Sequence, residues 1–481
     1  MSPGPVFSHW LPLYNIAQEL IARGHSVKWL KAIDAEHERT AKKLGVPESD
    51  CIAFPVTMEA EVLRKAILDL RQAGREKDMF TVLPLHQKVC DGAIKDNATV
   101  AAVQAYEPDL LVYDAPFPYG LPVANKLKIP AVSMWVIGPL GDFLTYLVGS
   151  PSGVSTMPQF NMWYPQPMSF WSRLQNTKAW AIGLLMMKAW DDAYSPIWRE
   201  NGMPDGSYAK SQRRSVASIF QGDFAYLPAL PMSPHCHVVG SLTARPPQAL
   251  PDKLQSFLDG ALDTGVIYIS SGTSAVPDAA QLRGISKAVE NIRIPVLWKL
   301  TATDKNTMKT NSIPIPKNVK SMDFLPQNDL LPHPAVKVFV TQGGTNSLYE
   351  TIYHGTPAII IPLIVEQTYN ANQAEMLGFG LAIDLPAPLD LKILEQHLTR
   401  AFKKILASDS YSHKAKELSH LMRAKRWTPV EKAASVIEES AWSNGSLHNH
   451  VWEHRQPWIP SADVPGESWK TLGFQKKGNF L

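Results

Sequence analysis

The most constraining feature of the sequence is a strand, turn, helix and strand pattern between residues 336 and 362. The apolar run Val336 to Thr341 has the composition of a buried strand and ends at Gly343-Gly344. A helix should follow, because the polar residues 345 to 347 can cap its start and Gly355 can end it before a second strand. A glycine turn lets the backbone approach an anion, and a helix start favours phosphate. The pattern predicts a diphosphate site in an α/β fold.

The residues on both sides of this pattern extend it into a longer motif. Residues 324 to 367 read FLPQNDLLPHPAVKVFVTQGGTNSLYETIYHGTPAIIIPLIVEQ. This stretch resembles the donor-binding motif of the family 1 UDP-glycosyltransferases at many spaced positions, and residues 149 to 176 resemble the animal or viral branch of that family more than the plant one. The resemblance implies a GT-B fold, an α/β architecture in which two Rossmann-like doubly wound parallel-sheet domains face a cleft.

The same resemblance assigns a role to individual donor-site residues. Phe324 would stack on uracil, and Gln327 would reach the uracil or ribose edge. Asn346 and Ser347 would bind the α-phosphate, and Glu350 would accept hydrogen bonds from the ribose hydroxyls. The remaining residues of the implied donor site are Leu325, Gly344, Thr345, the sugar-binding pair Glu366 and Gln367, and Thr273, which ends a strand and turn that resemble the start of the family's second domain.

Gln342 departs from the family pattern, in which most members have His at this position. That His donates to the β-phosphate, whereas the amide of Gln342 can donate a hydrogen bond but cannot become cationic. The TQGG form resembles that of the insect-virus ecdysteroid glucosyltransferases, so Gln342 is compatible with activity. A tuned role and tolerated drift both remain open for this position.

A second group of candidate residues lies near the start of the chain. Apolar residues at positions 13, 16, 17, 20 and 21 have helical spacing, which predicts a helix that ends at Gly24 and places His9 in the loop before it. This segment resembles the catalytic-histidine loop of the family, whereas His25 is expected to be structural. A basic His needs a carboxylate on its other ring nitrogen, and Asp114, at the end of the buried run 110 to 113, is the candidate.

The implied reaction is an inverting displacement without a covalent enzyme intermediate. His9 would take the proton of an acceptor hydroxyl as it attacks the anomeric carbon of a UDP-sugar, and Asp114 would orient His9.

The sequence has neither an Asp-x-Asp motif nor a clustered His/Cys set, so we expect metal-independent catalysis with no cofactor. UDP-glucose is the expected co-substrate, because an anionic Glu366 would disfavour glucuronate and no Arg or Lys occurs between residues 358 and 378.

Length and composition agree with two domains. The chain has 481 residues, of which 45% are hydrophobic, and a net charge of +3, which argues against a nucleic-acid partner. The predicted organisation is an acceptor-binding domain over residues 1–240, a linker over 241–252, a UDP-sugar-binding domain over 253–430, and a C-terminal helix and tail over 431–481 that returns to the first domain.

The acceptor is expected to be a lipophilic alcohol such as a sterol, a phenol or a lipid-like compound. In the family the mid-section of the first domain forms the acceptor pocket, and here it is rich in aromatic residues. Covering of helices, or contact with a membrane surface, is the alternative interpretation of these residues. The candidate acceptor residues are Trp10, Phe117, Trp135 and Phe143.

The three scattered cysteines and the lack of a long apolar run predict a cytoplasmic protein without a membrane anchor. Family members have a full strand before the His loop, and here only residues 1 to 7 are present, so we expect a short first strand or a truncated sequence. Two alternative functions stay open, namely a non-catalytic nucleotide-sugar-binding protein and a UDP-sugar epimerase on the same fold.

Overall fold

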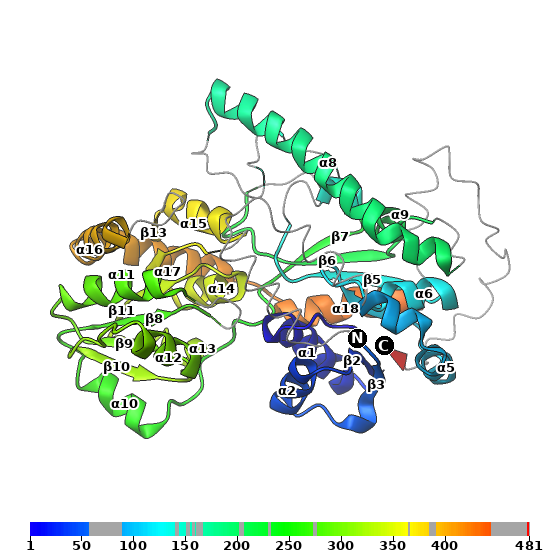
Figure 1. Cartoon of the computed structure of the whole chain (residues 1–481), viewed down its shortest axis with the longest axis horizontal. Helices are drawn as coiled ribbons and strands as arrows, with labels where there is room; N and C mark the ends of the chain where they lie inside the picture. Colours follow the sequence, from blue (N-terminus) through cyan, green and yellow to red (C-terminus); the bar gives the residue numbers. More distant parts are fainter. Residues whose placement is uncertain are drawn as a thin grey trace.

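The computed structural model describes residues 1–56, 89–139, 144–150, 154–155, 159, 167–201, 206–228, 232–272, 277–363, 366–383, 391–443 and 479–480. In Figure 1 the strands β2 to β7 and the strands β8 to β13 form two separate lobes, each with helices packed around its sheet. The long helix α8 (Phe170–Glu200) extends along the outside of the N-terminal lobe. Two helix-covered parallel sheets are the architecture that the sequence predicts.

The C-terminal lobe contains one parallel sheet of six strands in the order β10-β9-β8-β11-β12-β13. The strand order reverses between β8 and β11, so the chain winds outward on both sides of this pair. Open α/β sheets bind ligands at such a reversal, beyond the carboxyl ends of the strands. The strands are β8 (Val266–Ser270), β9 (Val296–Lys299), β10 (Val319–Met322), β11 (Val336–Thr341), β12 (Ala358–Ile360) and β13 (Gly380–Ala382).

Helix α14 (Thr345–His354) follows β11 directly, as the glycine turn predicts. Gly355 ends the helix with a φ of 69°, in the left-handed region that a residue without a Cβ reaches at little cost. The other helices of this lobe are α10 (Asp252–Asp259), α11 (Ala279–Glu290), α12 (Ala302–Thr310), α13 (Gln327–Leu330), α15 (Glu366–Met376), α16 (Leu391–Leu406) and α17 (Ser410–Arg423).

The N-terminal lobe contains a pair of parallel strands, β2-β3, and a four-stranded parallel sheet in the order β4-β5-β6-β7. Its apolar core is formed by the buried faces of these strands and of the helices packed on them. The strands are β2 (Trp29–Ala32), β3 (Cys51–Phe54), β4 (Leu111–Asp114), β5 (Ala131–Trp135), β6 (Ala217–Gln221) and β7 (Cys236–Gly240), and a short pair joins β1 (Ser26–Val27) to β14 (Asn479–Phe480).

Met1 and Ser2 occupy the place of a strand between β2 and β4. The Ser2 N–H donates to the Val112 carbonyl at 2.8 Å, and the Asp114 N–H donates back to the Ser2 carbonyl at 3.0 Å. On the other side, the Leu30 N–H donates to the Met1 carbonyl at 2.9 Å. These two residues therefore bond to the strands on both sides of them.

Helix α1 (Phe7–Ala22) begins two residues before His9, so the prediction that His9 lies in a loop was wrong. The apolar spacing was counted from Leu13, whereas the buried stripe of the helix begins one turn earlier with Trp10, which is 0% exposed. The other helices of this lobe are α2 (Ala35–Leu44), α5 (Asn97–Tyr106), α6 (Leu121–Leu127), α9 (Tyr208–Arg213) and the short segments 48–50 and 144–148.

The C-terminal helix α18 (Pro429–Trp442) packs on α1 and against β6 and β7 in the N-terminal lobe (Figure 1). Glu438 joins the two helices, because one carboxylate oxygen accepts from Arg23 Nη1 at 2.6 Å and the other contacts His25 Nε2 at 2.8 Å. His25 is thus a structural residue. This helix crosses from the last part of the chain to the lobe that contains His9.

Replacing Glu438 by Ala should destabilise the N-terminal lobe by about 2 kcal/mol, because Arg23 and His25 each lose a charge-assisted hydrogen bond, while Arg23 keeps Glu19. Thermal unfolding of the variant would measure the loss. Glu439→Ala is a suitable control for surface charge on the same helix, because Glu439 is exposed and its side chain makes no hydrogen bond that the structure records in its described part. Equal melting temperatures for the Glu438 variant and the wild type would contradict this account of α18.

Candidate active site

The side chains of His9 and Asp114 meet at the carboxyl end of β4. His9 Nδ1 lies 2.7 Å from Asp114 Oδ2, and the His9 and Asp114 side chains are 13% and 0% exposed, respectively. The first turn of α1 contributes the imidazole, and the last residue of a buried parallel strand contributes the carboxylate. A hydrogen bond at Nδ1 fixes the ring orientation and leaves Nε2 as the nitrogen that can take a proton. The sequence predicted this pair.

The carboxylate of Asp114 is shaped by the segment before α1. Its Oδ2 also accepts the Gly4 N–H at 3.0 Å, and a Cβ at Gly4 would lie only 2.5 Å from the same oxygen. Burial raises the pKa of Asp114, while the adjacent His9 and the Gly4 N–H act in the opposite direction. Gly4 was not predicted from the sequence, and its role depends on the close approach of the backbone to the carboxylate.

The turns after β8 and β11 meet where the strand order reverses. Gly272 has a φ of +73°, and a Cβ there would lie 2.3 Å from Nε2 of Gln342. Gly343, with a φ of +85°, packs against Ile360, where a Cβ would clash at 2.6 Å. The glycines of both turns are therefore required by contact as well as by backbone conformation. They bring the amide of Gln342 into the turn that the sequence assigns to the diphosphate.

The start of α14 has the properties of an anion site. Gly344 is the N-cap residue and has no side chain to cap the helix. In the part of the chain that the structure describes, the buried Thr345 hydroxyl has no hydrogen-bond partner. Lys299, which the sequence analysis missed, donates to the Gly272 carbonyl at 2.9 Å and adds a cation beside the same turn. Uncapped N–H groups, a hydroxyl and a nearby ammonium all favour a bound phosphate.

Three residues of the predicted donor site, Gln327, Ser347 and Glu350, form one hydrogen-bond network. Gln327 Nε2 donates to Ser347 Oγ at 3.0 Å and to Glu350 Oε2 at 2.7 Å. The Tyr268 hydroxyl donates to Gln327 Oε1 at 3.2 Å. Burial raises the pKa of Glu350 to about 7, and the bond from Gln327 opposes this effect. A ligand hydroxyl that bonded to Glu350 would stabilise its ionised form.

Glu366 and Gln367 begin helix α15. Burial raises the pKa of Glu366 to about 7, and the charge of His9 acts in the opposite direction. Gln367 is 3% exposed, and its Oε1 accepts the Leu363 N–H at 2.9 Å. The predicted sugar-binding pair therefore lies at the start of one helix.

Phe324 is 62% exposed and has an accessible ring face, as a base-stacking residue requires. The ammonium of Lys43, from α2 of the other lobe, lies 5.1 Å from the Phe324 ring centroid and 4.1 Å from that of Phe7. The pKa of Lys43 is lowered, mainly by burial and to a lesser extent by repulsion from Arg39. Leu325, by contrast, is 3% exposed and packs in the apolar core below the site.

Asn346 lies between the two lobes. Its Nδ2 donates to the Ser8 carbonyl at 3.0 Å, and its Oδ1 accepts from Gln221 Nε2 at 2.6 Å. Both polar groups of this side chain, which the sequence assigned to the α-phosphate, therefore contact the N-terminal lobe. Gln221 ends strand β6, and no sequence pattern distinguished it as a site residue.

The structure corrects two of the predicted acceptor residues. Trp10 is 0% exposed and stacks on Trp29 at 5.0 Å, and Trp135 is 2% exposed and stacks on Phe220 at 5.6 Å. Both are core residues, because they lie on the buried stripe of α1 and on a strand covered on both faces. Phe117 is only partly buried and contacts the His9 ring edge to face at 4.9 Å, where an acceptor would approach the base.

Two of the predicted residues, Thr273 and Phe143, lie outside the described residues, as does part of the aromatic mid-section. Within the described ranges, no helix is both long and apolar enough to span a membrane. The same ranges contain no cluster of three or more His, Cys, Asp or Glu side chains suited to a metal ion.

Comparison with solved structures places the fold in a known class. The glycosyltransferase Os79 from O. sativa, in complex with U2F and trichothecene, aligns with a TM-score of 0.59 and 14% identity over 92% of this chain and 100% of its own. The glycotransferase of kitacinnamycin aligns with a TM-score of 0.58 and 17% identity over 91% and 97%. The fold is that of the GT-B glycosyltransferases, which confirms the predicted class.

The sequence comparisons define the family. Residues 4–466 match the family model described as "UDP-glucoronosyl and UDP-glucosyl transferase". UDP-glucuronosyltransferase 2C1 of Oryctolagus cuniculus is 27% identical over 95% of this chain and 92% of its own length, and UDP-glucuronosyltransferase 2B7 of Homo sapiens is 25% identical over 96% and 88%. The chain belongs to the UDP-glucuronosyl and UDP-glucosyl transferase family, and it is a UDP-glycosyltransferase.

Replacing His9 by Ala should lower the rate of sugar transfer by about 10²- to 10⁴-fold, because the general base is lost. UDP affinity should stay close to that of the wild type, since the nucleotide-binding candidates lie in the other lobe. Product formation and calorimetric UDP binding would be measured on the same preparation. Asp114→Asn should slow transfer less, and a wild-type rate in the His9 variant would disprove the assignment of the base.

Proposed function

We propose that this protein transfers glucuronic acid from its UDP conjugate to a hydroxyl group of a lipophilic small molecule, with inversion at the anomeric carbon. The observation that carries the proposal is the bond between His9 Nδ1 and Asp114 Oδ2, at 2.7 Å, where α1 begins and β4 ends. Direct displacement needs such a base with an orienting carboxylate to take the proton of the acceptor hydroxyl.

In this mechanism the acceptor hydroxyl gives its proton to His9 Nε2 as its oxygen attacks the anomeric carbon. The bond from that carbon to the UDP oxygen breaks in the same step, and Asp114 stabilises the imidazolium that forms. The start of α14, the amide of Gln342 and the ammonium of Lys299 would stabilise the charge that develops on UDP. Most family members have at position 342 a His that can carry a positive charge. Gln342 is neutral, so in this protein the positive charge beside the diphosphate would come from Lys299.

The sugar proposed here differs from the glucose expected from the sequence. That expectation rested on an anionic Glu366, and burial raises the pKa of Glu366 to about 7, so a large share of the protein carries a neutral carboxyl near neutral pH. A protonated carboxyl can donate a hydrogen bond to a glucuronate oxygen instead of repelling it. The names of both relatives, which are UDP-glucuronosyltransferases, support the same choice.

Competition between UDP-glucuronic acid and UDP-glucose tests the sugar. Mass analysis of the products should show mainly glucuronide, and the glucuronide fraction should rise as the pH falls from about 8 to about 6, because Glu366 takes up a proton through this range. In the Glu366→Gln variant the fraction should no longer depend on pH. Mainly glucoside at every pH would identify glucose as the transferred sugar.

Chelation by EDTA should leave the transfer rate unchanged, because the proposed phosphate site uses a helix start and an ammonium rather than a divalent cation. The control is the same assay with added Mg²⁺. Loss of activity in EDTA that Mg²⁺ restores would contradict this part of the proposal.

The same assays separate transfer from the two other functions open to the sequence. Release of UDP that requires an acceptor hydroxyl supports transfer. A nucleotide-sugar-binding protein would bind UDP without releasing it from the sugar, and an epimerase would convert the UDP-sugar without an acceptor. A panel of sterols, phenols and fatty alcohols, read by product mass, would identify the acceptor class.

A further inference from the structure

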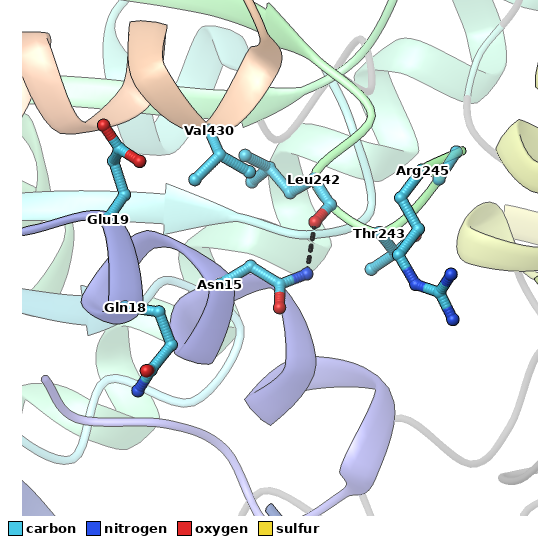
Figure 2. A pocket seen from close by; sticks show the side chains of 8 residues that line it. Asn15, Gln18, Glu19, Leu242, Thr243, Arg245 and Val430 are labelled. Atoms are coloured by element: carbon cyan, nitrogen blue, oxygen red, sulfur yellow. Dashed lines mark hydrogen bonds between the residues drawn. The ribbon is translucent and has the colours of Figure 1, made fainter. Parts of the chain in front are cut away.

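Four hydrogen bonds connect α1, the donor helix α14, the end of β6 and the interdomain linker in a closed ring. Asn346 donates to the Ser8 carbonyl at 3.0 Å, and Gln221 donates to Asn346 at 2.6 Å. The Leu242 N–H donates to Gln221 Oε1 at 3.1 Å, and Asn15 Nδ2 donates back to the Leu242 carbonyl at 2.7 Å. The last of these bonds joins two residues that line the groove shown in Figure 2, which lies between α1 and the segment 242–245.

Pro12 explains why the ring can close on α1. An ordinary residue at position 12 of this helix would donate its N–H to the Ser8 carbonyl, four residues earlier, and proline has no N–H to donate. The Ser8 carbonyl instead accepts from Asn346 of the other lobe. Asn15 lies seven residues after Ser8, which is about two helical turns, so the two contact points share one side of α1.

Within this ring of hydrogen bonds, the side chain of Gln221 connects the N-terminal lobe to Asn346 of the C-terminal lobe. Its side chain is 0% exposed, and its amide group donates to Asn346 and to the Val136 carbonyl while it accepts from Leu242. This pattern needs a side chain that has both a donor and an acceptor at its end. The amide of Gln has both. Neither Leu nor an ionised Glu could replace it.

We infer that Gln221 is a positioning residue for sugar transfer, and this inference rests on the proposed function. His9 follows Ser8 directly, so the bond from Asn346 sets where the base stands relative to the donor helix. Gln221 fixes the orientation of the Asn346 amide and thereby the distance from His9 to a sugar bound at α14. A shift of about 1 Å in such a distance can lower a rate by about 10²-fold.

Gln221→Leu should lower kcat at least about tenfold while the affinity for UDP changes less than about twofold. Gln18→Leu is the matched control, because Gln18 lines the same groove on α1, is exposed, and makes no hydrogen bond that the structure records in its described part (Figure 2). Its kcat should equal that of the wild type. Equal kcat values for the two Leu variants would overturn the inference.

Gln221→Glu tests the donated hydrogen bond by itself. An ionised Glu can still accept from Leu242 but cannot donate to Asn346, and a protonated Glu can do both. The ratio of variant kcat to wild-type kcat should therefore rise as the pH falls. A ratio that is independent of pH, in a variant that binds UDP normally, would contradict the role of the donated bond.

Pro12→Ala separates positioning from stability. The new N–H should bond the Ser8 carbonyl within the helix and compete with Asn346, so the melting temperature should rise while kcat falls. A purely structural role predicts that kcat stays constant or follows the melting temperature, and either result would overturn the inference.

Hydrogen exchange tests the ring without any assay of transfer. Amides at the start of α1 should exchange faster in Gln221→Leu than in Gln18→Leu, because the contact with α14 is weakened. Unchanged exchange would show that the ring does not fix α1. If the wild type shows this protection but transfers no sugar to any acceptor, the proposed function fails while the ring stands.

Discussion

The buried carboxylate of Asp114 is the interaction on which the rest of the site depends. A carboxylate without solvent is costly unless hydrogen bonds compensate it. In this chain the compensation comes from the Gly4 N–H and from His9, both in the segment that precedes or begins α1. The same segment fills the sheet between β2 and β4 through Ser2. One buried charge therefore determines the path of the N-terminal segment and the position of the base.

The donor side of the site depends on a different constraint, which is the reversal of strand order between β8 and β11. This reversal brings the turns at Gly272 and Gly343 together, and Gly344 leaves the start of α14 without a side-chain cap. Burial lowers the pKa of Lys299 and Lys43 and raises the pKa of Glu350 and Glu366. A diphosphate would stabilise the charged form of both lysines, and ligand hydroxyl groups would stabilise the ionised form of both carboxyls.

Local sequence patterns predicted the parts of the site that are contiguous in the chain. The boundaries of β11 and α14 and the position of Asp114 at the end of a strand follow from short-range rules about glycine, apolar runs and helix caps. The expected cap among residues 345 to 347 is wrong, because the N-cap residue is Gly344, which has no side chain. The same rules failed for His9, because the apolar stripe was counted from Leu13 although Trp10 extends it into the first turn. They also failed for Trp10 and Trp135, whose aromatic character suits a core as well as a ligand site.

The sequence by itself determined the family and the α/β class of the fold, and it gave the candidates for the base, its carboxylate and the acid of the sugar site. Only the tertiary structure decided which of these groups meet and what surrounds them. Gln221 and Lys299 became site residues because strands far apart in the chain end beside the same turns. Pro12 mattered because it has no N–H to donate to the Ser8 carbonyl, which accepts from Asn346 across the lobes. Pairings of this kind depend on distances between remote segments, which composition and periodicity do not encode.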